Sequence, residues 1–247
     1  MKDKKFMKNL EKYFKGRTDV STKELSAFIK RQEPSLPDKT VSWKIHLLKE
    51  AGVLAHVNRG RYSFGDNKPL FQPPISEQLK NIYTQIKKEL PYINISIWDT
   101  RWLNSFMIHQ IGRFDVIIET EKDAMDPVFN LLSEKNKNVF VNPDKKTLER
   151  YSGNYNESII IMPLITEAPT ISANGIITAS IEKILVDCLV ETELFSAQQE
   201  ELDNIFKTAF EKFSINIHRA SRYARRRDHL KELENMLKEL NQTSAKK

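Results

Sequence analysis

Arg59 and Arg61 flank Gly60 in the segment VLAHVNRGRYSF, between two short runs rich in β-branched and aromatic residues. Glycine tolerates the positive φ that a tight turn requires, so the pattern predicts a β-hairpin with arginines at its tip. Guanidinium groups bind phosphate oxygens well. Arginines beside a turn are more often solvated than functional when they stand alone, so the residues that precede the hairpin decide between the two interpretations.

The segment immediately before the hairpin has the spacing of an amphipathic helix over about residues 38–51. Val41, Ile45 and Leu48 form its apolar stripe. The opposite side offers side chains that neutralise phosphates or contact base edges, namely Lys39, Thr40, Ser42, Trp43, Lys44 and His46. Trp43 has a second interpretation, in which it covers the junction of this helix and the hairpin.

Two further helices precede this one, over about residues 4–15 and 22–33. Ser21 or Thr22 is expected to cap the second helix, with Glu24 in its first turn. Three helices followed by a hairpin is the order of a winged helix-turn-helix, in which the third helix enters the DNA major groove and the hairpin lies on the adjacent backbone or minor groove. The expected partner is double-stranded DNA, although winged helices also serve as protein-binding modules.

The charge distribution agrees with a nucleic-acid-binding first segment. Residues 1–66 hold 15 Lys and Arg against 8 Asp and Glu, whereas the whole chain holds 39 against 33. The entire positive surplus therefore lies in the first quarter of the chain, and the remainder is close to neutral. A compact basic module of this kind most often binds nucleic acid.

A second basic cluster lies in HRASRYARRRDHLK, residues 218–231. It contains five arginines, Arg219, Arg222, Arg225, Arg226 and Arg227. Arginine favours bidentate recognition of phosphate or carboxylate, so we expect a second basic patch here, or else an ordinary solvated helix face. The pattern leaves open whether such a patch binds DNA, RNA or protein.

The fold class expected from these patterns is α+β, with an N-terminal winged helix-turn-helix followed by a mixed α/β body that ends in a helical section. The boundaries are a DNA-binding domain over 1–66, a proline-rich linker over 67–75, the body over 76–240 and a disordered tail over 241–247. In the body we expect a helix over 100–111, strands over 114–119, 158–165 and 171–178, and helices over 180–191, 198–213 and 217–240.

No catalytic residue, metal site or cofactor is expected. Asp115, Glu119 and Glu121 surround a predicted strand, as carboxylates do in metal-dependent nucleases, but the lysine that such a motif needs is wrongly spaced. We therefore interpret them as surface or loop-end carboxylates. Asp99 fits a helix N-cap, and Cys188 fits a buried position on the apolar face of its helix.

The chain is expected to be a cytoplasmic protein without a membrane segment. It holds one cysteine, no secretory signal and no apolar run of the roughly 18–20 residues that span a bilayer. Leucines at 230, 233, 237 and 240 have heptad-like spacing, which predicts packing on the body or a dimer contact. A monomer or a weak dimer is expected.

Two body segments, ASIEKILVDCLVETELF and INIHRASRYARRR, together with the winged helix and the proline-rich joint, resemble the AbiEi-like antitoxins of type IV (abortive infection) toxin–antitoxin systems. The resemblance covers about residues 20–230. It implies a DNA-binding autorepressor of a two-gene operon, whose winged helix binds inverted repeats at the promoter. It also implies antagonism of a nucleotidyltransferase-like toxin that needs no stable complex, with the body required for antitoxicity. By position, the third-helix and hairpin residues named above would contact the DNA.

Two other functions stay open from the sequence. One is a stand-alone winged-helix transcription regulator whose body senses a ligand or a partner. The other, which is less favoured, is a nucleic-acid-modifying enzyme that uses Asp115, Glu119 or Glu121.

Overall fold

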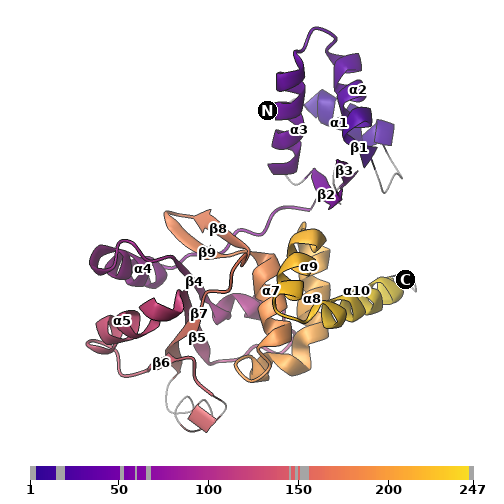
Figure 1. Cartoon of the computed structure of the whole chain (residues 1–247). Coiled ribbons are helices and arrows are strands. Elements are labelled where there is room, and N and C mark those ends of the chain that lie inside the picture. Colours follow the sequence, from indigo (N-terminus) through magenta and orange to yellow (C-terminus); the bar gives the residue numbers. More distant parts are fainter. Residues whose placement is uncertain are drawn as a thin grey trace. The chain divides into compact units, whose positions relative to one another are not determined.

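The chain forms two compact units in the computed structural model (Figure 1). Unit 1 comprises Met1–Phe71 and Lys212–His218, and unit 2 comprises Gln72–Glu211 and Arg219–Lys247. The structure describes residues 4–14, 20–50, 53–58, 60–64, 68–144, 146–147, 150 and 156–244. Arg59, one of the predicted contact residues, lies outside these ranges. No helix in the described ranges is long and apolar enough to cross a bilayer.

Three helices and a small antiparallel sheet form the N-terminal part of unit 1. The helices are α1 (Lys4–Phe14), α2 (Thr22–Gln32) and α3 (Asp38–Glu50), and the strands are β1 (Val20–Ser21), β2 (Leu54–Asn58) and β3 (Arg61–Phe64) in the order β1-β3-β2. The three helices bury one apolar core, which includes Leu10, Leu25, Ile29, Val41 and Leu48. Strand β1 has only two residues, which is too short for a sequence pattern to reveal.

The predicted cap of α2 is confirmed. Ser21 accepts a hydrogen bond from the Glu24 amide at 3.2 Å, and the Glu24 carboxylate accepts one from the Ser21 amide at 2.9 Å. The hairpin tip is tied to the same place, because the Gly60 carbonyl accepts hydrogen bonds from the Thr22 amide (2.8 Å) and hydroxyl (3.0 Å). Gly60 has φ +75°, as the predicted turn requires. The start of α2 therefore fixes the hairpin turn.

A four-stranded sheet with helices on both faces forms the centre of unit 2 (Figure 1). Its strands are β4 (Ile95–Asp99), β5 (Phe114–Thr120), β6 (Val139–Val141) and β7 (Glu157–Pro163), in the order β4-β5-β7-β6. Strand β7 is parallel to both β5 and β6, whereas β4 is antiparallel to β5. Helices α4 (Glu77–Glu89) and α5 (Lys122–Ser133) lie on one side of the sheet, and α7 (Ile181–Val190) lies on the other with α8 (Leu202–Lys212), α9 (Ile217–Arg226) and α10 (Leu230–Ser244).

A hairpin covers the outer edge of β4. It consists of β8 (Thr170–Ala173) and β9 (Ile176–Ala179), and the Thr178 hydroxyl donates a hydrogen bond to the Ile97 carbonyl at 2.6 Å. All five residues of β4 are buried, although β4 ends the four-stranded sheet. The single strand expected over 171–178 is wrong, because Asn174 and Gly175 both take positive φ and turn the chain back.

Three other expectations about the helices need correction. The helix expected over 100–111 is a short 3-10 helix, η1 (Thr100–Ser105), and the helix expected over 198–213 begins as a 3-10 turn, η3 (Ser196–Glu201), before α8. The helix expected over 217–240 is interrupted, since Asp228 has φ +59° and separates α9 from α10. Helix α10 then continues to Ser244, into the segment expected to be disordered.

A buried carboxylate explains why no helix follows η1. Glu201 is almost completely buried, and its oxygens accept hydrogen bonds from the amides of Ile108 and His109, both at 3.1 Å. The His109 ring lies 2.5 Å from the same carboxylate, and the Asn204 amide donates to it at 2.9 Å. The hydrogen bond with the His109 ring, followed by that from the Ile108 amide, lowers the pKa of Glu201 to about 2. The loop after η1 is thus held by an ionised side chain of η3.

Glu201→Gln is expected to destabilise the protein in a pH-dependent way. Because the folded-state pKa of Glu201 lies below its usual value of 4.5, its ionised form stabilises the fold above that pH, and this contribution is lost as the pH falls toward 2. The difference in free energy of unfolding between wild type and variant, measured by urea denaturation, should shrink as the pH falls from 5 toward 2. Glu200→Gln, at the exposed neighbouring position, should show no such trend. A difference that grows as the pH falls would contradict the assignment.

Candidate nucleic-acid interface

Helix α3 presents two chemically different faces. Val41, Ile45 and Leu48 point into the core of unit 1 and are at most 4% exposed. Four exposed side chains, Lys39, Ser42, Trp43 and His46, follow the helical spacing i, i+3, i+4, i+7 and therefore share the opposite side. We call these four residues the α3 outer face. The structure thus brings together four of the six contact residues that were predicted on this helix.

Trp43 is the most unusual member of the α3 outer face. Its side chain is 57% exposed, and its ring centroid lies 5.2 Å from that of His46 with 35° between the planes. A tryptophan that covered the junction of helix and hairpin would be buried, so this exposure favours the alternative, a contact residue.

The other two predicted contact residues of α3, Lys44 and Thr40, are less exposed. Lys44 forms an ion pair with Glu33, and its ammonium lies 5.5 Å from the centroid of the Phe6 ring. The Lys44 side chain is only 14% exposed. Thr40 is half-buried in the first turn, where its amide donates to the Pro37 carbonyl at 2.9 Å. The Lys44 side chain is therefore engaged within unit 1, and Thr40 is partly covered.

Of the two arginines predicted at the hairpin, the structure describes Arg61. Arg61 is exposed and begins β3, opposite Ser21 of β1 and Asn58 of β2. Arg59 lies outside the described residues. The pairing puts Arg61 beside the turn at Gly60, as the sequence predicts.

The arginines of α9 contact the segment that follows β7. Arg219 donates to the Thr170 carbonyl at 2.7 Å, and Arg226 donates to the Thr166 hydroxyl at 2.6 Å. Arg222 forms an ion pair with Glu167 at 3.5 Å. These three arginines therefore hold the loop between β7 and β8 against α9.

The two remaining arginines of this cluster differ in their exposure to solvent. Arg225 is exposed on α9. Arg227 is only 13% exposed and forms ion pairs with Asp187, at 3.1 Å, and with Glu191. Of the predicted second basic patch, most guanidinium groups thus have partners within unit 2, and the patch is less open to a phosphate than the sequence suggests.

The ion pairs of Arg227 belong to a buried charged cluster. Lys183, which has no exposed side-chain surface, contacts the carboxylates of Glu119 and Asp187. The Tyr223 hydroxyl donates to Asp187 at 2.8 Å. The cluster joins β5, α7 and α9, and we call it the Lys183 cluster.

Burial and ion pairing act against each other in this cluster. Burial raises the pKa of the Glu119 carboxyl, although Lys183 lowers it in part. For Lys183 burial disfavours the charged form, but Asp187 and Glu119 raise its pKa overall. The expectation of Glu119 as a surface or loop-end carboxylate is therefore wrong, because the sequence does not reveal its partner on α7.

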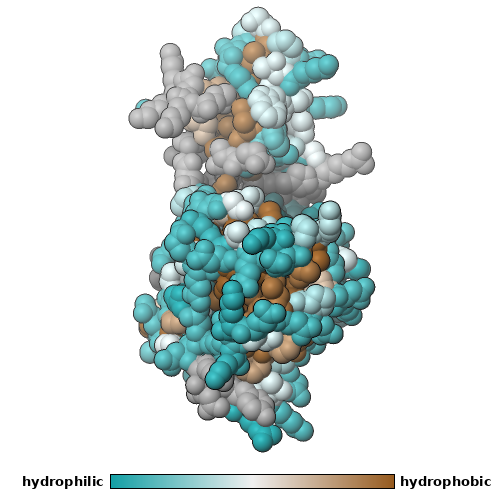
Figure 2. All heavy atoms as spheres, turned by 90° about the vertical axis from the view of Figure 1, so that its left-hand side faces the viewer, coloured by the Kyte–Doolittle hydropathy of each residue, from teal (hydrophilic) through white to brown (hydrophobic). Residues whose placement is uncertain are grey.

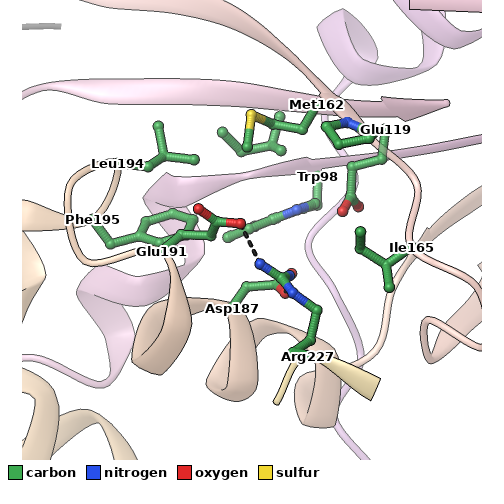
Figure 3. A pocket seen from close by; sticks show the side chains of 11 residues that line it. Trp98, Glu119, Met162, Ile165, Asp187, Glu191, Leu194, Phe195 and Arg227 are labelled. Atoms are coloured by element: carbon green, nitrogen blue, oxygen red, sulfur yellow. Dashed lines mark hydrogen bonds and ion pairs between the residues drawn. The ribbon is translucent and has the colours of Figure 1, made fainter. Parts of the chain in front are cut away.

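Glu119 also lines a small cavity at the carboxyl ends of β5 and β7 (Figure 3). Trp98 and Phe195 supply aromatic walls, Arg227 and Glu191 are joined by an ion pair, and the cavity volume is about 30 Å³. That volume holds a water molecule but no larger ligand. Such a cavity gives no room for a nucleotide or a sugar.

The other candidate catalytic groups have structural surroundings. Asp99 caps η1 as predicted, accepting a hydrogen bond from the Arg101 amide at 2.8 Å. Glu121 accepts hydrogen bonds from the Asn94 amide at the end of β5. Cys188 is buried as expected, and burial raises the pKa of its thiol, which disfavours a nucleophilic thiolate.

Asp115 lines a larger cavity of about 310 Å³, together with Arg113, Glu193, Ser196 and Gln198. Its carboxylate is 3.5 Å from the Arg113 guanidinium, and burial raises its pKa. Within the described ranges no three His, Cys, Asp or Glu residues lie close enough together to hold a metal ion.

One face of unit 2 carries a concentration of apolar surface. Figure 2 shows hydrophobic residues gathered at the centre of this face, with hydrophilic residues around them. An apolar area with a polar rim is typical of surfaces that contact proteins or ligands, whereas nucleic-acid-binding surfaces are strongly positive.

The chain thus has a mixed α/β fold. Its first unit is basic and exposes the polar and aromatic side chains of the α3 outer face. Residues 40–243 match the family described as "Family of unknown function (DUF6577)", so the chain belongs to this family. A comparison with curated proteins finds no match.

Lys183→Met is expected to lower the free energy of unfolding by about 3–5 kcal/mol, because it removes the cation that contacts the buried Glu119 carboxylate. Adding Glu119→Gln to this variant should recover part of the loss, since the uncompensated charge is then removed. The measurement is a double-mutant cycle by urea denaturation at pH 7. Lys135→Met, at an exposed position after α5, should change stability little. Additive losses in the double variant would show that the two groups are not coupled.

Proposed function

We propose that this protein is a DNA-binding antitoxin and transcriptional autorepressor of a type IV, AbiE-like toxin–antitoxin operon, acting in the cytoplasm. Unit 1 is its winged helix-turn-helix and binds promoter repeats in double-stranded DNA. The observation that carries the proposal is the α3 outer face, where a lysine, a hydroxyl, an indole and an imidazole stand exposed beside an arginine-bearing hairpin. The surplus positive charge of the chain lies in the same segment.

The element order of unit 1 supports this assignment. Helices α2 and α3 are followed directly by the β2–β3 hairpin, and the core holds α3 by one side only. In a winged helix-turn-helix the helix in the position of α3 lies in the major groove, and the hairpin reaches the neighbouring backbone. The outer face and the hairpin arginines would then contact one duplex together.

Unit 2 is assigned the antitoxin role. The two segments that carry the resemblance to AbiEi-like antitoxins, 179–195 and 215–227, meet in the Lys183 cluster through Asp187, Tyr223 and Arg227. Their charged residues serve the fold of the unit, which supports a binding or positioning role for the body rather than catalysis. Its face with an apolar centre offers a surface for toxin antagonism (Figure 2).

A second candidate function is a winged-helix regulator whose body senses a ligand. The cavity of about 310 Å³ beside Asp115 favours it, because cavities of this size hold small molecules. The two candidates share the DNA-binding unit and differ in the task of unit 2.

Replacing Arg59 and Arg61 by alanine is expected to weaken binding to all duplexes alike, because hairpin arginines would contact phosphates rather than bases. Fluorescence anisotropy with the duplex upstream of the gene, measured at several salt concentrations, should show tight salt-dependent binding by the wild type. The slope of log K against log salt should fall by about two in the variant.

The matched control is the double variant Lys135→Ala with Lys137→Ala, which removes the same charge from exposed positions of unit 2. It should bind like the wild type. Absence of duplex binding by the wild type at low salt would overturn the DNA-binding part of the proposal.

The antitoxin part is tested by co-expression. If a nucleotidyltransferase-like reading frame adjoins the gene, its product should arrest growth and the full-length protein should restore it. The Arg59→Ala, Arg61→Ala variant, expressed from a foreign promoter, should still restore growth, because antitoxicity is assigned to unit 2. Failure of the wild-type chain to rescue growth would refute the antitoxin role and favour the ligand-sensing regulator.

A further inference from the structure

The set of side chains on α3 limits how this helix can read a DNA sequence. The helix, DKTVSWKIHLLKE, contains no arginine, asparagine or glutamine. These are the residues that make bidentate hydrogen bonds to guanine and adenine in the major groove, together with lysine at guanine. Among the members of the α3 outer face, only Lys39 can make such a contact, and it can equally bind a phosphate.

Neighbouring polar residues at the end of α2 do not supply the missing groups. The Arg31 guanidinium donates to the Tyr13 hydroxyl at 3.1 Å, and Gln32 accepts a hydrogen bond from Asn9 at 3.3 Å. Both side chains therefore face α1. Apart from Lys39, the α3 outer face therefore offers the hydroxyl, the indole and the imidazole for base recognition.

Trp43 provides the largest apolar surface on this face. The adjacent His46 ring, 5.2 Å away, restricts the positions that the indole can take. An apolar side chain in the major groove recognises the C5-methyl group of thymine, which adenine, guanine and unmodified cytosine lack. The positive surplus of residues 1–66 selects a polyanion as the occupant of this face, and an acidic protein becomes an outcome of the test.

We propose that Trp43 reads thymine through its C5-methyl group and that the protein consequently binds duplexes with thymine opposite the middle of α3. This inference rests on the proposed function, since it requires unit 1 to bind DNA. It goes further by naming the specificity-determining residue and the base that it selects. Ser42 and His46 add single hydrogen bonds to neighbouring base edges.

The experiment uses the full chain and a duplex selected by the wild-type protein from a randomised pool. Each thymine of the selected site is then replaced, one at a time, by deoxyuridine, which removes only the methyl group. At the contacted thymine, wild-type affinity should fall about fourfold, the effect of exposing one buried methyl group. Trp43→Ala should bind the thymine and deoxyuridine duplexes equally.

Lys39→Ala is the matched control on the same face. It should weaken binding to both duplexes by the same factor and keep the fourfold ratio, because Lys39 contributes charge. Trp43 is more than half exposed, so its replacement should leave the fold intact, which circular dichroism checks.

Two failures are distinguishable. If the wild type binds the selected duplex but no thymine shows a methyl effect, or if Trp43→Ala keeps that effect, the inference is overturned while DNA binding stands. If the pool yields no bound duplex at low salt, the DNA-binding proposal itself fails, and the α3 outer face belongs to a protein partner.

Discussion

The buried ammonium of Lys183 is the constraint on which the arrangement of unit 2 depends. A charged group without exposed surface is stable only when opposite charges lie beside it, so Glu119 of β5 and Asp187 of α7 must both stay in place. Asp187 in turn accepts hydrogen bonds from Tyr223 and Arg227, which connects the C-terminal helices to the same point. Sheet, packing helix and C-terminal segment are therefore coupled through one side chain, in addition to their apolar contacts.

This coupling changes the meaning of the arginine-rich segment. In the sequence, residues 219–227 look like a single basic surface, yet Arg227 serves the buried cluster and Arg219 binds the backbone at Thr170. A guanidinium that is held by carboxylates is a poor site for a phosphate, because binding would require it to leave its partner. Arg222, Arg225 and Arg226 stay exposed on α9, as Lys39 and Arg61 do in unit 1.

Local patterns in the sequence predicted local structure well. The spacing of Ser21 and Glu24 gave the cap of α2, and Gly60 gave the hairpin turn, because both depend on residues that are neighbours in the chain. The four-residue α3 outer face follows from helical periodicity for the same reason. The pairing of Glu119 with Lys183 spans 64 positions and leaves no periodic trace, so it could not be predicted. The Asn174-Gly175 pair is typical of a hairpin turn and could have been predicted from the sequence. The apolar residues on either side of it favoured a single strand instead.

The two units therefore illustrate two ways of placing polar groups, with different consequences for change. On α3, Val41, Ile45 and Leu48 hold the helix, and the outer face can vary without a cost to the core because its side chains contact solvent. In unit 2 each charged residue of the Lys183 cluster requires its partners, so a single replacement leaves a buried charge without its counter-charge. A helix face that is free to vary on a fixed support is suited to selecting among ligands, whereas a mutually dependent cluster is suited to holding one shape. This division agrees with the roles proposed for the two units, DNA recognition by unit 1 and a fixed binding surface on unit 2.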